Sequence, residues 1–159
     1  MDSFYIITNM LKDKDLRITN EIRAYIESRG KRCVLCRKDA EGHIIPDTVP
    51  DDVECGLVLG GDGTVNETVN GICFPEKATL GYIPTGSGND FARGLGLPKE
   101  PLEALGIILR REKTIHMDIG VLLGKKSRRF LVSAGMGFDA AVCHEVCVSH
   151  LKVLLNKIG

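Results

Sequence analysis

Three glycines surround one aspartate in the segment GGDGTVNETVNG, which runs from Gly60 to Gly71. Glycines can adopt positive φ and let backbone N–H groups come close to an anion, and a helix that starts after them adds a favourable dipole. The segment lacks the Gly-Lys-Ser/Thr ending of the common P-loop, and Asn66 stands where a dinucleotide fingerprint needs its third glycine. We therefore expect a phosphate site with a different geometry.

Asp62 separates this segment from a passive phosphate site. A carboxylate beside polyphosphate is tolerable when Mg²⁺ lies between them, and it can also accept a proton or hydrogen bond from an attacking hydroxyl. Either role indicates phosphoryl transfer. The structural alternative is a tight turn in which Asp62 caps a helix from Thr64 onward.

A second loop, PTGSGND from Pro84 to Asp90, again offers glycines, hydroxyls and a carboxylate after an apolar run. Its structural alternative is a turn in which Asn89 or Asp90 caps the next helix. Two such loops at one edge of a sheet favour a shared site over two unrelated turns.

Strands and helices must alternate if both loops are to share an edge, and residues 1–112 have that pattern. The expected strands span residues 4–8, 33–36, 56–59 and 79–83, and the expected helices span residues 14–29, 65–72, 91–95 and 102–111. Asp13 or Asp15 can cap the first helix, and Gly30 ends it. The alternation predicts an α/β fold with a Rossmann-like parallel sheet flanked by helices, whose carboxyl edge binds ligand.

The pattern changes near Thr114. Two strand-like runs, residues 115–123 and 129–134, flank the basic turn GKKSRR and predict a hairpin, and a helical pattern follows over residues 139–158. Two strands and one helix bury little by themselves. We therefore expect residues 1–112 to form one domain and residues 113–159 to be the incomplete start of a second, which would favour self-association into a homo-oligomer.

The composition sets limits on partners and compartment. The 159 residues include 21 basic and 21 acidic side chains, so no bulk attraction to nucleic acid is expected. No apolar run is long enough to span a membrane, and the first residues lack a signal-peptide pattern. A cytoplasmic protein is favoured, peripheral contact with a membrane remains open, and the six cysteines are expected to be reduced thiols.

Read together, GGDGTVNETVNGI and LGYIPTGSGNDFARGLGLP resemble the diacylglycerol kinase catalytic-domain superfamily, which includes bacterial lipid kinases and sphingosine kinases. The Asp118-Ile119-Gly120 and SAGMGFDAAV segments extend the resemblance, which covers the chain from Gly56 to its end. It implies an ATP-dependent phosphotransferase that uses Mg²⁺ and phosphorylates a lipid alcohol such as diacylglycerol. It also implies a β-rich second domain after the nucleotide-binding α/β domain.

The resemblance assigns roles by motif position. The nucleotide would meet Asn9, Gly60, Gly61, Asp62, Gly63, Thr64, Val65, Asn66 and Ser87. Ser87 replaces the threonine that the family usually has, and it keeps the hydroxyl. Asp62 and Asp90 would be the supporting catalytic carboxylates. The remaining supporting residues would be Glu67, Gly86, Gly88 and Asn89.

The N-terminal segment departs from that family. The first strand should end in Asn-Pro-x-Ser/Ala-Gly, whereas this chain has Thr8-Asn9-Met10-Leu11-Lys12. The residues before Gly60 resemble NAD kinase more closely, and NAD kinases share the fold and the GGDGT loop. The alternatives are a fusion with its seam near Gly60 and a divergent lipid-kinase N-terminus. NAD kinase is accordingly the alternative function.

The C-terminal part is the second departure. In the lipid kinases the second domain supplies a structural Mg²⁺ site and a late carboxylate that acts as general base, and neither can be placed here, so no metal ligand is assignable. We therefore expect weak or no kinase activity from this chain alone. An inactive, truncated nucleotide-binding fragment is the third possible function.

Two other groups of residues could do chemistry. Cys33 and Cys36 could bind zinc with Cys143, Cys147 and His150, but thiols packed as small hydrophobes are favoured. The basic cluster of Lys125, Lys126, Arg128 and Arg129 is explained by solvation of a hairpin turn, with anionic headgroups as the functional alternative.

Overall fold

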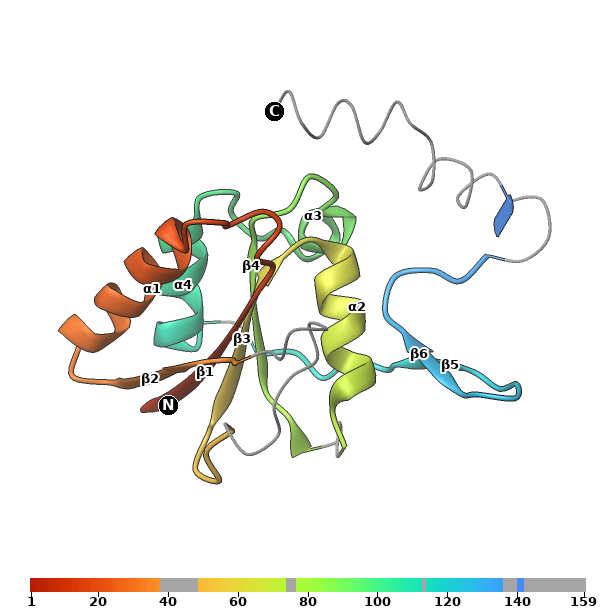
Figure 1. Cartoon of the computed structure of the whole chain (residues 1–159), viewed down its shortest axis with the longest axis horizontal. Helices are drawn as coiled ribbons and strands as arrows, with labels where there is room; N and C mark the ends of the chain where they lie inside the picture. Colours follow the sequence, from red (N-terminus) through yellow and green to blue (C-terminus); the bar gives the residue numbers. More distant parts are fainter. Residues whose placement is uncertain (38–48, 74–76, 113, 136–139, 142–159) are drawn as a thin grey trace.

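Four parallel strands form the centre of the computed structural model, which describes residues 1–37, 49–73, 77–112, 114–135 and 140–141. The strands are β1 (Ser3–Thr8), β2 (Arg32–Leu35), β3 (Cys55–Gly60) and β4 (Leu80–Pro84), in the order β2-β1-β3-β4 (Figure 1). The predicted parallel sheet is confirmed, and each expected strand is present to within about one residue at either end.

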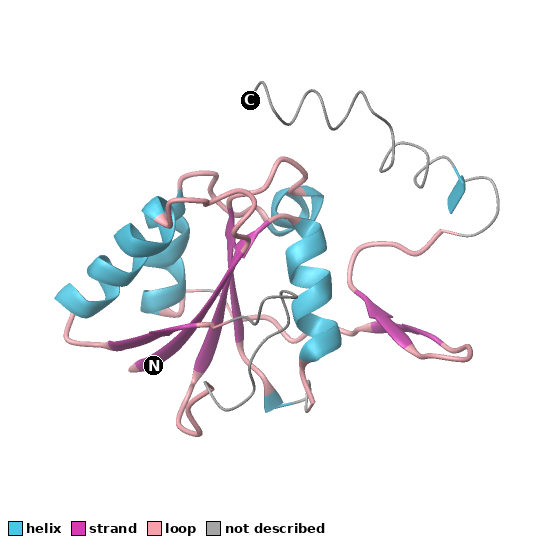
Figure 2. Ribbon diagram, viewed as in Figure 1, coloured by secondary structure: helices cyan, strands magenta, loops and turns pink. Residues whose placement is uncertain are grey.

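Helices cover both faces of the sheet, as Figure 2 shows. Helices α1 (Arg17–Ser28) and α4 (Pro101–Arg110) lie on one face, and α2 (Asp62–Gly71) and α3 (Asp90–Leu95) lie on the other. Strand side chains alternate between these layers. In β3, Leu57 and Leu59 pack with Ile22 and Ile26 of α1, whereas Val58 packs with Val65 of α2.

Helix α2 begins earlier than the sequence suggested. We expected its start at residue 65, but Asp62 is already helical. The reason is the extended backbone of Gly61, with φ −102° and ψ −171°, whose carbonyl accepts the N–H groups of Thr64 and Val65. Asp62 therefore lies inside the first turn of α2 and is not its cap.

Asp13 organises the start of α1, as predicted for Asp13 or Asp15. Its buried carboxylate accepts the N–H groups of Ile18 and Thr19 at 3.2 and 2.8 Å and the Thr19 hydroxyl at 2.6 Å. The Thr19 hydroxyl also lies 3.0 Å from that of Thr8, at the end of β1. Although burial acts in the opposite direction, the bonds from Thr19 and Ile18 hold the pKa of Asp13 below its usual value.

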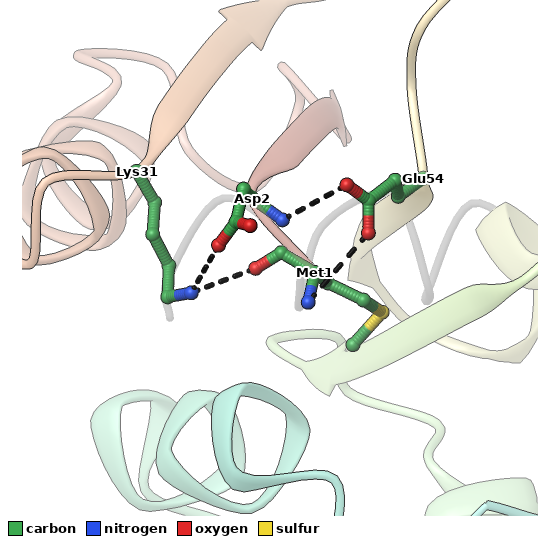
Figure 3. A network of polar contacts seen from close by, with 4 residues as sticks. All are labelled: Met1, Asp2, Lys31 and Glu54. Carbon is green, nitrogen blue, oxygen red and sulfur yellow. Dashed lines mark hydrogen bonds and ion pairs between the residues drawn. The ribbon is translucent and has the colours of Figure 1, made fainter.

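The first strand is also fixed at its N-terminal end (Figure 3). The Lys31 ammonium donates to the Met1 carbonyl and the Asp2 carboxylate at 2.8 and 2.7 Å. Glu54 accepts the Asp2 N–H at 3.3 Å and lies 3.6 Å from the α-amino group. These contacts hold β1 between the segments that lead into β2 and β3, at the edge of the sheet opposite the two loops.

The predicted hairpin is present but shorter than expected, with β5 at Gly120–Leu122 and β6 at Arg128–Phe130. Asn70 of α2 docks it: its amide accepts the Arg129 N–H at 2.9 Å and donates to the Arg129 carbonyl at 2.8 Å. The Arg129 guanidinium donates to the carbonyls of Val69 and Ile72 at 2.9 and 2.6 Å. Arg129 is therefore a C-terminal cap of α2, so solvation does not explain it.

The described cysteines are free thiols. Burial raises the pKa of Cys33 and Cys55 to about 11, which fits packing as small hydrophobes. Cys143, Cys147 and His150 lie outside the described residues, as does most of the helix expected over residues 139–158. No helix in the described part of the chain is both long and apolar enough to cross a membrane.

Replacing Asn70 with alanine should free the hairpin from α2. The substitution leaves the N–H and carbonyl of Arg129 without their partner, at a cost of about 1–3 kcal/mol in local stability. We expect faster hydrogen–deuterium exchange at residues 128–130 and little change in the sheet. Arg128→Ala, an exposed neighbouring change, is the control, and unchanged exchange in the Asn70→Ala variant would contradict this docking.

Asp13→Asn tests the start of α1 through pH. Because the folded-state pKa of Asp13 is depressed, its contribution is present above the unfolded value of 3.8 and is lost as the pH falls through the lower folded value. Urea unfolding at pH 7 should therefore show a less stable variant, and the difference should shrink below about pH 4. A stability difference between the variant and the wild type that does not depend on pH would contradict this explanation.

Candidate functional site

Two loops leave the carboxyl ends of neighbouring strands. The first glycine loop is defined here as residues 60–64, from the last residue of β3 into the first turn of α2, and the second as residues 84–90, from the last residue of β4 to the first of α3. Gly60 pairs with Pro84 in the parallel register, and the Thr85 N–H donates to the Gly60 carbonyl at 3.0 Å. The two loops therefore begin side by side, as the sequence predicted.

The loops then touch backbone to backbone. A Cβ added to Gly86 would lie 2.5 Å from the Gly61 nitrogen, and one added to Gly61 would lie 2.7 Å from the Gly88 carbonyl oxygen. A Cβ at Gly60 would lie 2.6 Å from the Cβ of Thr64. We predicted that the glycines of the first loop serve through positive φ, but none of them has it. Close approach is the physical reason for glycine at 60, 61 and 86.

Asp62 joins the loops through its main chain and its side chain. Its N–H donates to the Gly88 carbonyl at 3.1 Å. Its carboxylate accepts the N–H of Asp90 at 2.8 Å and that of Phe91 at 3.1 Å. These are the first two N–H groups of α3, so Asp62 caps α3 from another element. The expected capping role exists, but on a different helix from the one we predicted.

Tyr82 of β4 holds the second glycine loop through a chain of hydrogen bonds. Its buried hydroxyl donates to the Asn89 side-chain oxygen at 3.2 Å, and the Asn89 amide donates to the Gly86 carbonyl at 2.6 Å. Burial, and then the nearby Asp62 carboxylate, raise the pKa of the Tyr82 phenol, so it stays protonated as a donor. Sequence reasoning missed Tyr82, although a buried tyrosine directly before a glycine loop needs a partner for its hydroxyl.

Asn9 brings a third strand end to the site. It follows β1, and its amide donates to the Thr64 hydroxyl at 3.2 Å while its side-chain oxygen accepts the Leu11 N–H at 3.0 Å. Thr64 is buried between Asn9 and Gly60. The predicted residue therefore contacts the first glycine loop, even without the proline and glycine of the usual motif.

The remaining predicted residues divide into exposed and buried sets. Gly63, Ser87, Gly88 and Asp90 are exposed in the two loops, and Glu67 is exposed on α2. Asp90 also forms an ion pair with Arg93. Val65 is a core residue, 4% exposed, and its N–H is bonded to the Gly61 carbonyl, so it offers a phosphate neither side chain nor donor.

This arrangement fits an anion held by backbone groups. In the first turn of α2 the N–H groups of Asp62, Thr64 and Val65 already donate to the carbonyls of Gly88 and Gly61. The N–H of Gly63 has no acceptor among the described residues, a Cβ at Gly63 would meet nothing within 4 Å, and the helix dipole adds to the field there. The buried Asn66 side-chain oxygen has no hydrogen-bond partner among the described residues. No group of three or more His, Cys, Asp or Glu side chains in the described part is placed to hold a metal.

The comparison with family models gives a match to the diacylglycerol kinase catalytic domain over residues 4–122. The match runs through Gly60 and includes the residues before it. Of the two alternatives for the N-terminal segment, this continuity supports a divergent lipid-kinase N-terminus over a seam near Gly60.

Curated relatives and a solved structure agree with this family match. A diacylglycerol kinase of Staphylococcus carnosus is 41% identical over 97% of this chain, and one of Bacillus subtilis is 34% identical over 78% of it. The alignments cover 51% and 40% of those proteins, so the chain spans about half of their length. A Bacillus anthracis structure described as a diacylglycerol kinase superposes with a TM-score of 0.51 and 26% identity, covering 69% of this chain and 39% of its own.

Gly86→Ala tests the backbone contact between the loops. The new Cβ would overlap the backbone of Gly61, so the loops must separate, at a cost of about 1–3 kcal/mol in unfolding free energy. Gly88→Ala is the matched control in the same loop, because a Cβ there meets nothing within 4 Å. Urea unfolding should show a lower unfolding free energy for Gly86→Ala and an unchanged one for Gly88→Ala. Equal stability of the two variants would contradict the contact.

Proposed function

Because the chain belongs to the diacylglycerol kinase catalytic domain family, we propose that it binds ATP for transfer of the γ-phosphoryl group to the hydroxyl of a diacylglycerol-like lipid alcohol. The observation that carries this proposal is the joining of two glycine loops by Asp62, within the matched residues. The joined loops form one rim that can hold a polyphosphate in a fixed position. Positioning of this kind is the main protein contribution to phosphoryl transfer.

The residues of the rim have separate proposed tasks. The N–H of Gly63, in the first turn of α2, donates to a phosphate oxygen, and the helix dipole favours the charge. Ser87 and Gly88 contact the nucleotide from the second loop. Asn9 and Thr64 keep the first loop at the end of β1. Mg²⁺ bound to ATP offsets the phosphate charge.

The carboxylates act on the acceptor side. The lipid hydroxyl forms a bond to the γ-phosphorus while the bond to the ADP oxygen breaks, and the hydroxyl proton passes to a base. Asp62 and Asp90 support this step by orienting the hydroxyl and the metal-bound nucleotide, with Glu67 and Asn89 beside them. Both oxygens of Asp62 accept α3 N–H groups, so its orientation is fixed before substrate arrives.

The same proposal covers organisation and location. Residues 1–112 form the nucleotide-binding domain, and residues 113–159 belong to a second, β-rich domain. The protein works in the cytoplasm, in lipid metabolism and phospholipid biosynthesis, and meets its acceptor at a membrane surface as a peripheral protein. NAD kinase is not favoured, because the family match includes the residues before Gly60.

The function is tested by binding followed by transfer. Isothermal titration should show that the chain binds ATP in the presence of Mg²⁺. With γ-labelled ATP, any label that is transferred, which we expect to be little for this chain alone, should pass to diacylglycerol in mixed micelles and not to NAD. Label on NAD would overturn the lipid assignment, and absence of ATP binding would overturn the assignment of the two glycine loops.

Asp62→Asn should lower phosphoryl transfer by a factor of about 10² or more, because it removes the charge that orients the hydroxyl and weakens the cap of α3. The weaker cap predicts faster hydrogen exchange at residues 90 and 91. Asp51→Asn, the same change on an exposed carboxylate outside the site, is the control. Wild-type transfer by the Asp62→Asn variant would rule out this role.

A further inference from the structure

We propose that the tip of the β5–β6 hairpin docks on the surface of an anionic lipid bilayer. The hairpin tip is defined here as Leu122, Leu123, Lys125, Lys126 and Arg128. The inference deepens the proposed function, since it names the surface through which the protein meets its membrane. It does not depend on catalysis, because docking needs neither nucleotide nor transfer.

The apolar part of the tip is unusually exposed. Leu123 is 85% exposed and Leu122 46%, and the two are adjacent in the chain. Val121 pairs with Arg129 across the hairpin and therefore shares the face that Arg129 turns to α2. Singly exposed aliphatic side chains are normal on a soluble protein, but adjacent ones mark an interaction surface. Figure 1 shows the hairpin projecting beyond α2, away from the four-stranded sheet.

The charged part of the tip has one sign. Residues 119–135 contain four basic side chains and no acidic one. Arg129 is committed to the carbonyls of Val69 and Ile72. Lys125, Lys126 and Arg128 are exposed, and among the described residues none of them forms an ion pair. Three uncompensated cations therefore flank the apolar residues.

Apolar and cationic side chains together fit a bilayer better than a nucleic acid. Aliphatic side chains can enter the boundary between headgroups and acyl chains, while lysine and arginine stay among anionic headgroups. Nucleic acid would attract the cations but would make no favourable contact with Leu122 or Leu123. Single strands stack on aromatic side chains, and duplexes are bound through hydrogen bonds and charge. The whole chain is electrically neutral, so the attraction must be local.

The docking of Arg129 sets how the tip is presented. The Asn70 side chain bonds both the N–H and the carbonyl of Arg129 in β6, and the Arg129 guanidinium bonds the C-terminal end of α2. Alternate side chains of a strand point to opposite faces. With Arg129 directed to α2, its neighbour Arg128 is left for an external partner, in agreement with its exposure.

A single fluorophore tests contact with lipid, because the chain contains no tryptophan. Leu123→Trp should give a blue-shifted emission with vesicles of phosphatidylcholine and phosphatidylglycerol in a 3:1 mixture, and no shift with phosphatidylcholine alone. Val49→Trp, at an exposed apolar position outside the hairpin, should show no shift with either. A shift at both positions, or at neither, would overturn the proposal.

Charge variants test the cations in the unlabelled protein. Lys125→Gln/Lys126→Gln/Arg128→Gln should weaken partitioning onto the anionic vesicles by roughly a hundredfold, about fivefold for each charge. Arg17→Gln/Lys99→Gln/Arg111→Gln removes the same charge elsewhere and should weaken it far less. Equal losses in the two variants, or duplex DNA binding that is tighter than vesicle binding, would contradict the proposal. ATP titration of each variant reports on the nucleotide site separately, so failure of docking is distinguished from failure of the proposed function.

Discussion

The site depends on one steric constraint: the backbones of the two glycine loops are in direct contact, with no room for side chains between them. A Cβ atom at Gly86 would overlap the backbone of Gly61, and a Cβ atom at Gly61 would overlap the carbonyl of Gly88. Parallel pairing of β3 and β4 brings the loops to the same edge, but the absent side chains let them touch. The usual argument for glycine-rich loops is conformational freedom, whereas here it is the volume that glycine leaves empty.

Polar groups turn this contact into a defined geometry. Asp62 begins α2, where its N–H donates to the Gly88 carbonyl, and its carboxylate caps α3, so one residue joins the N-termini of the two helices. Asn9 and Tyr82 secure the loops from β1 and β4. Hydrogen bonds of this kind are individually modest, but loss of one partner leaves the other without it. The rim is therefore organised before any ligand arrives.

The alternation of strands and helices was predictable because buried strands and amphipathic helices leave distinct periodicities in the sequence. The two loops were recognisable from residue types, and their meeting followed from the parallel topology. The partners of Asp62 and Tyr82 were not predictable, since they lie 28 and 7 residues away and depend on how two turns pack. Arg129 shows the same limit: in the sequence it belongs to a basic turn, and in the structure it caps α2.

The central claim is that the two glycine loops act together as one nucleotide site. Amide chemical shifts in the ¹⁵N-labelled chain, followed during titration with ATP and Mg²⁺, test it most directly. The account predicts saturable shifts at Gly61, Gly63, Ser87 and Asp90 that share one dissociation constant, with the amides at the start of β1 unmoved. Shifts confined to one loop, or centred on the edge near Met1 and Glu54, would contradict it.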